Sequence, residues 1–215
     1  MALAATHMRF ALEMKDVLGV RDLEKYLSGS MYPDSRYYSG INREATHDPA
    51  PFVNGVMHLD DFRKGWAMHL SCDVAQAEAI SHYFPEDLAR AESNEEKWIF
   101  RTAIKCLQDR DDAKHFDARK YSQMMTCYEG PNGETEEQLS TFYGLFIELY
   151  EREQLTLDDE FDVWVRIGMP ESGVKLQRQL AARLSRDATV MDCIAKLYNE
   201  TLTRYRLVSI SQEPS

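Results

Sequence analysis

Hydrophobic residues recur at helical spacing through most of this chain. In the segment 3–17, the apolar side chains of Leu3, Phe10, Met14 and Val17 are separated by seven, four and three residues. That spacing places them on one face of a helix. The same kind of pattern predicts further helices at 21–29, 60–84, 92–108, 113–127 and 134–153, a short element at 158–173, and a long helix or kinked pair of helices at 174–207.

Helix breakers separate these segments. The stretch 29–47 is predicted to be a loop, because Pro33 and Gly40 interrupt it and two further prolines follow. Gly-Pro-Asn-Gly at 130–133 predicts a turn. The alternation of apolar and polar residues that is typical of strands persists nowhere. We therefore expect an all-α fold with a single helical domain over 1–215.

The amino-acid composition indicates a globular domain and argues against nucleic-acid-binding and membrane-spanning proteins. The chain has 215 residues, of which 44% are hydrophobic and 11% aromatic, which is enough for the core of one domain. The formal net charge is −11, which disfavours long duplex nucleic acid as a partner because phosphate binding needs a surplus of Lys and Arg. No apolar run approaches the ~18 residues of a membrane helix, so no membrane span is expected.

The N-terminal segment and the cysteines bear on localisation. The first twenty residues lack a basic region followed by an apolar core, so no signal peptide is expected. Four cysteines, Cys72, Cys106, Cys127 and Cys193, lie far apart without a Cys-x-x-Cys pair. We interpret them as free, buried thiols in a reducing compartment, which predicts a cytoplasmic protein.

Histidines gather in the first part of the chain, where five of the six precede residue 83. His69 and Asp73 are four residues apart in the predicted helix 60–84, so their side chains leave the same face on adjacent turns. An imidazole and a carboxylate in that arrangement can bind one divalent ion. This pair indicates a metal site.

Three further residues complete the predicted ligand set. His7 lies in the first helix, and Asp34 and His47 lie in the predicted loop 29–47. Nitrogen and oxygen ligands of this kind suit Zn²⁺, with Fe²⁺ or Mn²⁺ as alternatives. Each residue alone has an ordinary structural explanation, such as packing, a surface ion pair or a turn. The prediction of a metal site rests on all five together.

The order of these elements resembles the zinc-dependent phospholipase C family, whose fold is shared with the S1/P1 nucleases. That family shows a Gly-x-x-x-Pro-Asp loop, a following His, and a Gly-aromatic-x-x-His-Leu-x-x-Asp helix. Here the corresponding residues are Gly29 to Asp34, His47, and the stretch GWAMHLSCD at 65–73, with His7 in the first helix. The resemblance covers residues 7–73, roughly a third of the chain.

The resemblance implies an all-helical fold and a cluster of two or three zinc ions, of which we expect two. It implies that Asp34, His47, His69 and Asp73 hold one ion, and that Asp73 bridges to a second ion held by His7. The metal-site region would be 1–90, and 91–215 would complete the helical domain. Members of the family hold another ion with a later histidine pair and a glutamate. His82 and Glu86 stand in comparable positions here, although Pro85 lies between them, and His82 is therefore also a candidate ligand.

These expectations define a function. We expect an enzyme, a hydrolase of the metal-dependent phosphoesterase class, which acts on a small phosphate ester, a phosphodiester or a lipid headgroup through a metal-activated water. Asp34 would be catalytic, since it would hold metal and also orient or deprotonate the water. Arg36 and Arg43 are candidates to bind phosphate oxygens of the substrate, and Tyr37 is a candidate for the pocket wall.

Two other interpretations stay open. The doublet His47-Asp48 is also found in HD-domain phosphohydrolases and HD-type di-iron oxygenases, although the two prolines that follow it favour a loop. A non-catalytic helical interaction protein is the other alternative. Zinc with phosphodiesterase activity, iron with oxygen consumption, or no metal would distinguish the three.

Overall fold

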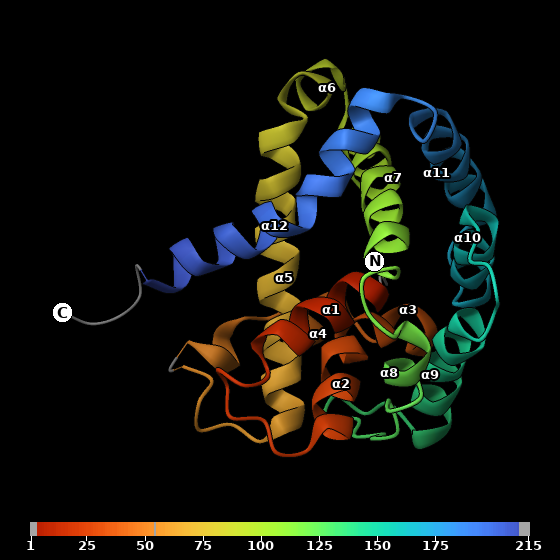
Figure 1. Cartoon of the computed structure of the whole chain (residues 1–215). Coiled ribbons are helices and arrows are strands. Elements are labelled where there is room, and N and C mark those ends of the chain that lie inside the picture. Colours follow the sequence, from red (N-terminus) through yellow and green to blue (C-terminus); the bar gives the residue numbers. More distant parts are fainter. Residues whose placement is uncertain (1–3, 54, 211–215) are drawn as a thin grey trace.

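The computed structural model describes residues 4–53 and 55–210, and every regular element in these ranges is helical (Figure 1). This confirms the predicted all-α class and the single helical domain. The elements are α1 (Ala4–Met14), α2 (Leu23–Met31), η1 (Tyr32–Ser35), α3 (Arg36–Ser39), α4 (Arg43–Thr46), η2 (Ala50–Phe52), α5 (Asp61–Tyr83), α6 (Pro85–Arg90), α7 (Asn94–Asp112), α8 (Ala118–Ser122), α9 (Glu136–Tyr150), α10 (Leu157–Arg166), α11 (Glu171–Leu184) and α12 (Ala188–Ile210).

The long helix α5 organises the fold. Helix α2 packs against its first half, and α12 packs across α5 and α7 (Figure 1). Helix α7 runs antiparallel to α5 and also contacts α1 and α11. Helix α1 contacts α2, α5 and α7, so the N-terminal helix lies where the three meet.

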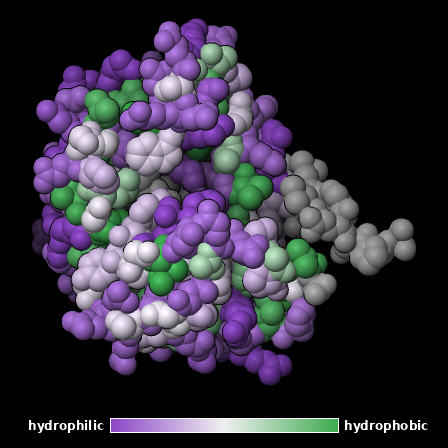
Figure 2. Space-filling view, turned by 180° about the vertical axis from the view of Figure 1, so that it is seen from behind, coloured by the Kyte–Doolittle hydropathy of each residue, from purple (hydrophilic) through white to green (hydrophobic). Residues whose placement is uncertain are grey.

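The face of the molecule in Figure 2 is mainly hydrophilic. The face in Figure 2 shows apolar residues in small separate groups and a hollow with hydrophilic walls near its middle. No described helix has the length and apolar character that a membrane crossing requires.

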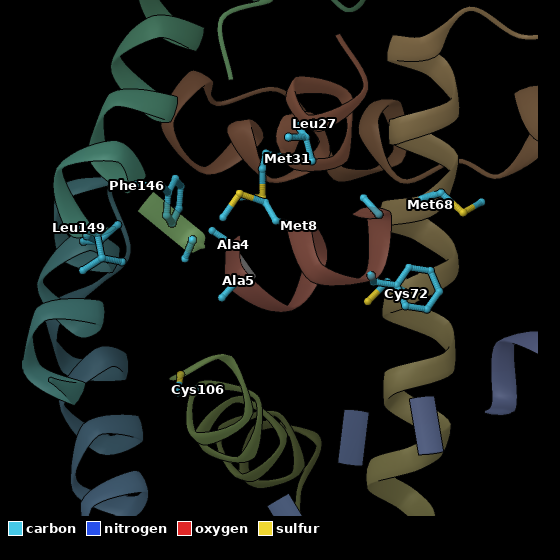
Figure 3. Close-up of a cluster of buried hydrophobic side chains, with 14 of the residues drawn as sticks. Ala4, Ala5, Met8, Leu27, Met31, Met68, Cys72, Cys106, Phe146 and Leu149 are labelled. Atoms are coloured by element: carbon cyan, nitrogen blue, oxygen red, sulfur yellow. The ribbon is translucent and has the colours of Figure 1, made fainter. Parts of the chain in front are cut away.

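The core joins the N-terminal and C-terminal halves. Figure 3 shows its side chains where α1 meets α2, α5, α7 and α9: Ala4, Ala5, Met8, Leu27, Met31, Met68, Cys72, Cys106, Phe146 and Leu149. All four cysteines are free, as predicted. Cys72 and Cys106 are buried, whereas Cys127 and Cys193 are only half-buried, so the prediction of burial was wrong for the latter two.

Two glycines allow α2 and α5 to cross at very short range. A Cβ atom on Gly29 would lie 2.0 Å from the carbonyl oxygen of Phe62, and one on Gly65 would lie 2.0 Å from that of Tyr26. No larger residue fits at either position without separating the helices. The close crossing brings the chain that follows Gly29 next to the middle of α5.

The long and strongly periodic segments were predicted well. Helix α5 begins directly after Asp60, whose carboxylate accepts a hydrogen bond from the Arg63 N–H, and it ends before Pro85 as expected. The predicted segment at 174–207 is a pair of helices, α11 and α12, and the predicted turn at 130–133 is also present.

Two segments differ from their predictions. The stretch 29–47 is not an open loop but a succession of the end of α2, η1, α3 and α4. Pro33 does not break this path, because it stands in the first turn of η1, where a missing N–H costs nothing. The predicted helix 113–127 is reduced to α8, with turns on both sides.

Candidate metal centre

Five predicted ligands converge from four parts of the fold. His7 comes from α1, Asp34 from η1, His47 from the residue after α4, and His69 and Asp73 from α5. Within the described residues, two groups offer ligand atoms that all lie within 4.8 Å of one another, namely His7 with His69 and Asp73, and Asp34 with His47 and His69. The helical i,i+4 spacing and the α2–α5 crossing together produce this convergence.

The carboxylates lie among the imidazole Nε2 atoms. Asp73 Oδ1 is 3.8 Å from His7 Nε2, and Asp73 Oδ2 is 3.9 Å from the Nε2 atoms of both His47 and His69. Asp34 Oδ1 is 3.8 Å from His47 Nε2. Two ligands on one zinc ion are each about 2.0–2.2 Å from it, so they lie at most about 4.4 Å apart. The observed separations fall within that limit.

A backbone carbonyl fixes the orientation of His69. The Nδ1 atom lies 2.8 Å from the carbonyl oxygen of Ser30, which can only accept, so Nδ1 carries the proton. The lone pair is then on Nε2, which is buried and forms no hydrogen bond within the described part of the chain. A buried nitrogen lone pair aimed at two carboxylates fits a metal ion. His7 stacks on this ring with 3.9 Å between ring centres.

A hydrogen bond to Nδ1 also fixes the orientation of the His47 ring. Its Nδ1 atom lies 2.8 Å from the Thr46 hydroxyl, which itself donates to the Arg43 carbonyl. Nδ1 is thus held by the hydroxyl, and Nε2 faces the carboxylates. The indole N–H of Trp66 donates to the Thr46 carbonyl at 2.7 Å, which ties this segment to α5.

Burial and charge set the protonation states required of ligands. Burial lowers the pKa of His69 and, further, that of His7, and it lowers the pKa of His47 to about 3. The imidazoles are thus neutral near pH 7, the form that binds metal. Burial opposes ionisation of Asp73, but the ammonium of Lys105 outweighs it and holds the Asp73 pKa well below its usual range. The pKa of Asp34 is also lowered, to about 2, although burial acts in the opposite direction.

Lys105 is a member of the cluster that the sequence did not indicate. It comes from α7, and its Nζ atom lies 2.7 Å from Asp73 Oδ1. The site therefore extends beyond the predicted region 1–90. No motif marks this lysine, and the only signal was a basic residue at an inward-facing position of the predicted helix 92–108.

The structure does not bring His82 to the cluster. It lies thirteen residues after His69 on α5, roughly 20 Å along the helix, and it is exposed. Glu86 is also exposed and forms an ion pair with Arg90 at 2.9 Å. The cluster of this structure accordingly contains the first five predicted ligands and not the sixth.

The predicted substrate-binding residues lie at different depths. Arg36 and Tyr37 are half-buried beside the site, with the Arg36 guanidinium carbon 3.8 Å from the centre of the Tyr37 ring. Burial, assisted by the charge of Asp34, raises the pKa of the Tyr37 phenol. Arg43 is exposed, although its carbonyl accepts the backbone N–H of His47.

The donor set, its burial and the orientation of His69 fit a divalent ion of the zinc type. Asp48, the second residue of the His-Asp doublet, lies outside the cluster. It is exposed, and its carboxylate accepts the Ala50 N–H at 2.9 Å. Comparison with known proteins gives no match to any family model, curated protein or solved structure.

Proposed function

We propose that this protein is a metal-dependent phosphoesterase that uses zinc and hydrolyses a small phosphate ester, a phosphodiester or a lipid headgroup. The observation that carries the proposal is the convergence of three neutral imidazoles and two carboxylates in two overlapping groups of ligand atoms. The motif resemblance to the zinc-dependent phospholipase C family supports the same reaction class. The four free thiols favour a reducing compartment, and we propose the cytoplasm.

The residues that would hold metal form two groups. Asp34, His47, His69 and Asp73 would hold one ion, and His7 with Asp73 would contribute to a second. When bound, such an ion lowers the pKa of water toward ~7 and stabilises negative charge on a phosphoryl group. Asp73 belongs to both groups, whereas His69 is assigned to the first ion alone, because its single available lone pair, on Nε2, serves one ion only.

Three side chains beside the ions would take part in the hydrolysis. Asp34 is ionised and buried, and its carboxylate would orient the attacking water and accept its proton. The Arg36 guanidinium, fixed on the Tyr37 ring, would bind a phosphate oxygen. Lys105 would add positive charge close to Asp73.

The geometry favours this function over an HD-type enzyme, because only His47 of the His-Asp doublet faces the cluster. A phosphoesterase also uses the arginine and lysine beside the cluster, which a purely structural metal site would not need. Because Arg43 is exposed, we propose that it acts at the edge of the site.

The test combines metal analysis with hydrolysis of a chromogenic phosphodiester. Protein purified without chelator should contain at least one zinc ion per chain, and removal of the metal should abolish hydrolysis until zinc or manganese is restored. Asp34→Asn should reduce hydrolysis by roughly 10²-fold or more. Metal content below ~0.2 per chain, or hydrolysis that survives complete removal of metal, would refute the proposed function.

A further inference from the structure

A cleft between α5 and α7 begins one helical turn beyond the metal centre. The Lys105–Asp73 ion pair fixes the register of these antiparallel helices. On the same two helix faces, the next residues are Ala77, four after Asp73, and Arg101, four before Lys105. Both line an open cleft of about 450 Å³, together with Glu78, Ser81, His82 and Arg204.

The two arginines of the cleft differ in whether a carboxylate neutralises their charge. Arg204 forms an ion pair with Glu200 at 2.7 Å. Arg101 forms no ion pair within the described residues, and its Nε atom is buried without a hydrogen-bond partner. Glu78 also lines the cleft, but it is exposed to solvent, so screening weakens its charge without removing it. An uncompensated guanidinium in a small cleft favours an anionic ligand.

The spacing of Lys105 and Arg101 indicates how far apart two anionic groups of that ligand would lie. Lys105 and Arg101 are one turn apart on α7, which corresponds to about 6 Å along the helix. Lys105 stands beside the metal centre, where the scissile phosphate would lie. Arg101 lines the cleft one helical turn further from Asp73 than Lys105 does.

We propose that the α5–α7 cleft is a substrate subsite that binds a second anionic group, about 6 Å from the scissile phosphate, through Arg101. The substrate class is then a small phosphate ester with a second phosphate or carboxylate group. This inference rests on the proposed function, because the metal centre defines where the scissile phosphate lies. The volume of the cleft suits a small molecule.

The test uses a matched pair of probes, propane-1,3-diyl bisphosphate and propyl phosphate, in calorimetric titrations of metal-loaded, desalted protein. The bisphosphate should bind at least tenfold more tightly than the monophosphate. In Arg101→Gln that preference should fall to threefold or less, with metal content unchanged. Arg90→Gln, which removes an exposed arginine that pairs with Glu86 on α6, should keep the full preference.

A second variant tests the cleft independently of Arg101. Glu78→Gln removes a negative charge from the cleft and should increase the preference for the bisphosphate severalfold. A metal-loaded protein that binds both probes equally, or an Arg101→Gln variant with full preference, overturns the inference alone. Absence of metal from the wild-type protein overturns the proposed function instead. Circular dichroism establishes that each variant is folded.

Discussion

The backbone of Gly65 lies against that of Tyr26 so closely that a Cβ atom on residue 65 would be 2.0 Å from the Tyr26 carbonyl oxygen. It would also be 2.7 Å from the backbone nitrogen of Ser30. The carbonyl of the same Ser30 orients His69. The crossing of α2 and α5 thus determines both the packing and the position of a candidate metal ligand.

Gly65→Ala should destabilise the protein by about 3 kcal/mol or more, because backbone atoms must move apart to admit the methyl group. Urea denaturation measures this loss. Zinc affinity should fall as well, since Ser30 moves away from His69.

Gly144→Ala is the matched control. Gly144 lies inside α9, and a Cβ atom there meets nothing within 4 Å. Alanine is the better helix former, so this variant should gain up to about 1 kcal/mol and keep its metal. Equal stability of the two variants would show that the α2–α5 crossing tolerates a side chain.

Local patterns were sufficient to predict the long helices and the convergence of His69 and Asp73. A period near 3.6 identifies α5, and i,i+4 spacing puts both side chains on one face regardless of the tertiary fold. The sequence also offered His7, Asp34 and His47 as candidate ligands, and the resemblance implied the same residues. The fold then had only to bring four segments together, which it does through the Gly29 and Gly65 contacts.

Long-range packing produced the features that the sequence did not predict. Lys105 is adjacent to Asp73 only because α7 runs antiparallel to α5, and no local pattern encodes that pairing. His82 was a candidate ligand because histidines cluster in the sequence. It lies thirteen residues after His69 on the same helix, which is too far along α5 to reach the cluster. The short helices within 29–47 depend on tertiary contacts, which outweigh the weak propensity of a segment rich in breakers.

Asp73→Asn and Cys72→Ala compare adjacent residues with different roles. The asparagine keeps the size of Asp73 but loses the charge that faces three imidazoles and Lys105. Metal content and hydrolysis should fall together, the rate by roughly 10²-fold or more. Elemental analysis and the chromogenic assay measure both.

Cys72 is fully buried in the core, so its truncation should cost only ~1–2 kcal/mol. The Cys72→Ala variant should keep the metal content of the wild-type protein. If Asp73→Asn kept full metal and full activity, Asp73 would be only the partner of Lys105, and the proposed function would lose its central support.

Trp66→Phe tests whether the hydrogen bond from Trp66 to the Thr46 carbonyl helps to position His47. Phenylalanine fills most of the same space but cannot donate a hydrogen bond to the Thr46 carbonyl, which precedes the ligand. Loss of such a supporting contact typically weakens metal binding about tenfold or more. Competition with a chelating dye measures zinc affinity. Trp98→Phe, at a position 41% exposed on α7, should match the wild type, and equal affinities of the two variants would argue against this support.

Glu160 provides a pH-dependent prediction away from the metal centre. Its side chain is 3% exposed, and neither carboxyl oxygen has a hydrogen-bond partner in the described part of the structure. Burial, reinforced by the charge of Asp109, raises the Glu160 pKa well above 4.5. The folded state therefore holds a proton that the unfolded state has already released. This contribution to stability is present at low pH and is lost as the pH rises through the raised pKa.

The wild-type protein should consequently lose more stability between pH 5.5 and pH 8 than Glu160→Gln, which carries no proton to lose. We expect the two changes in Tm to differ by about 4 °C or more. Comparing each variant with itself at the two pH values removes any constant effect of the buried amide. Glu148→Gln is the control, because Glu148 is exposed and its ion pair with Arg166 lowers its pKa, so it stays ionised throughout this range. Parallel pH profiles for Glu160→Gln and the wild type would mean that Glu160 is ionised in the folded protein despite its burial.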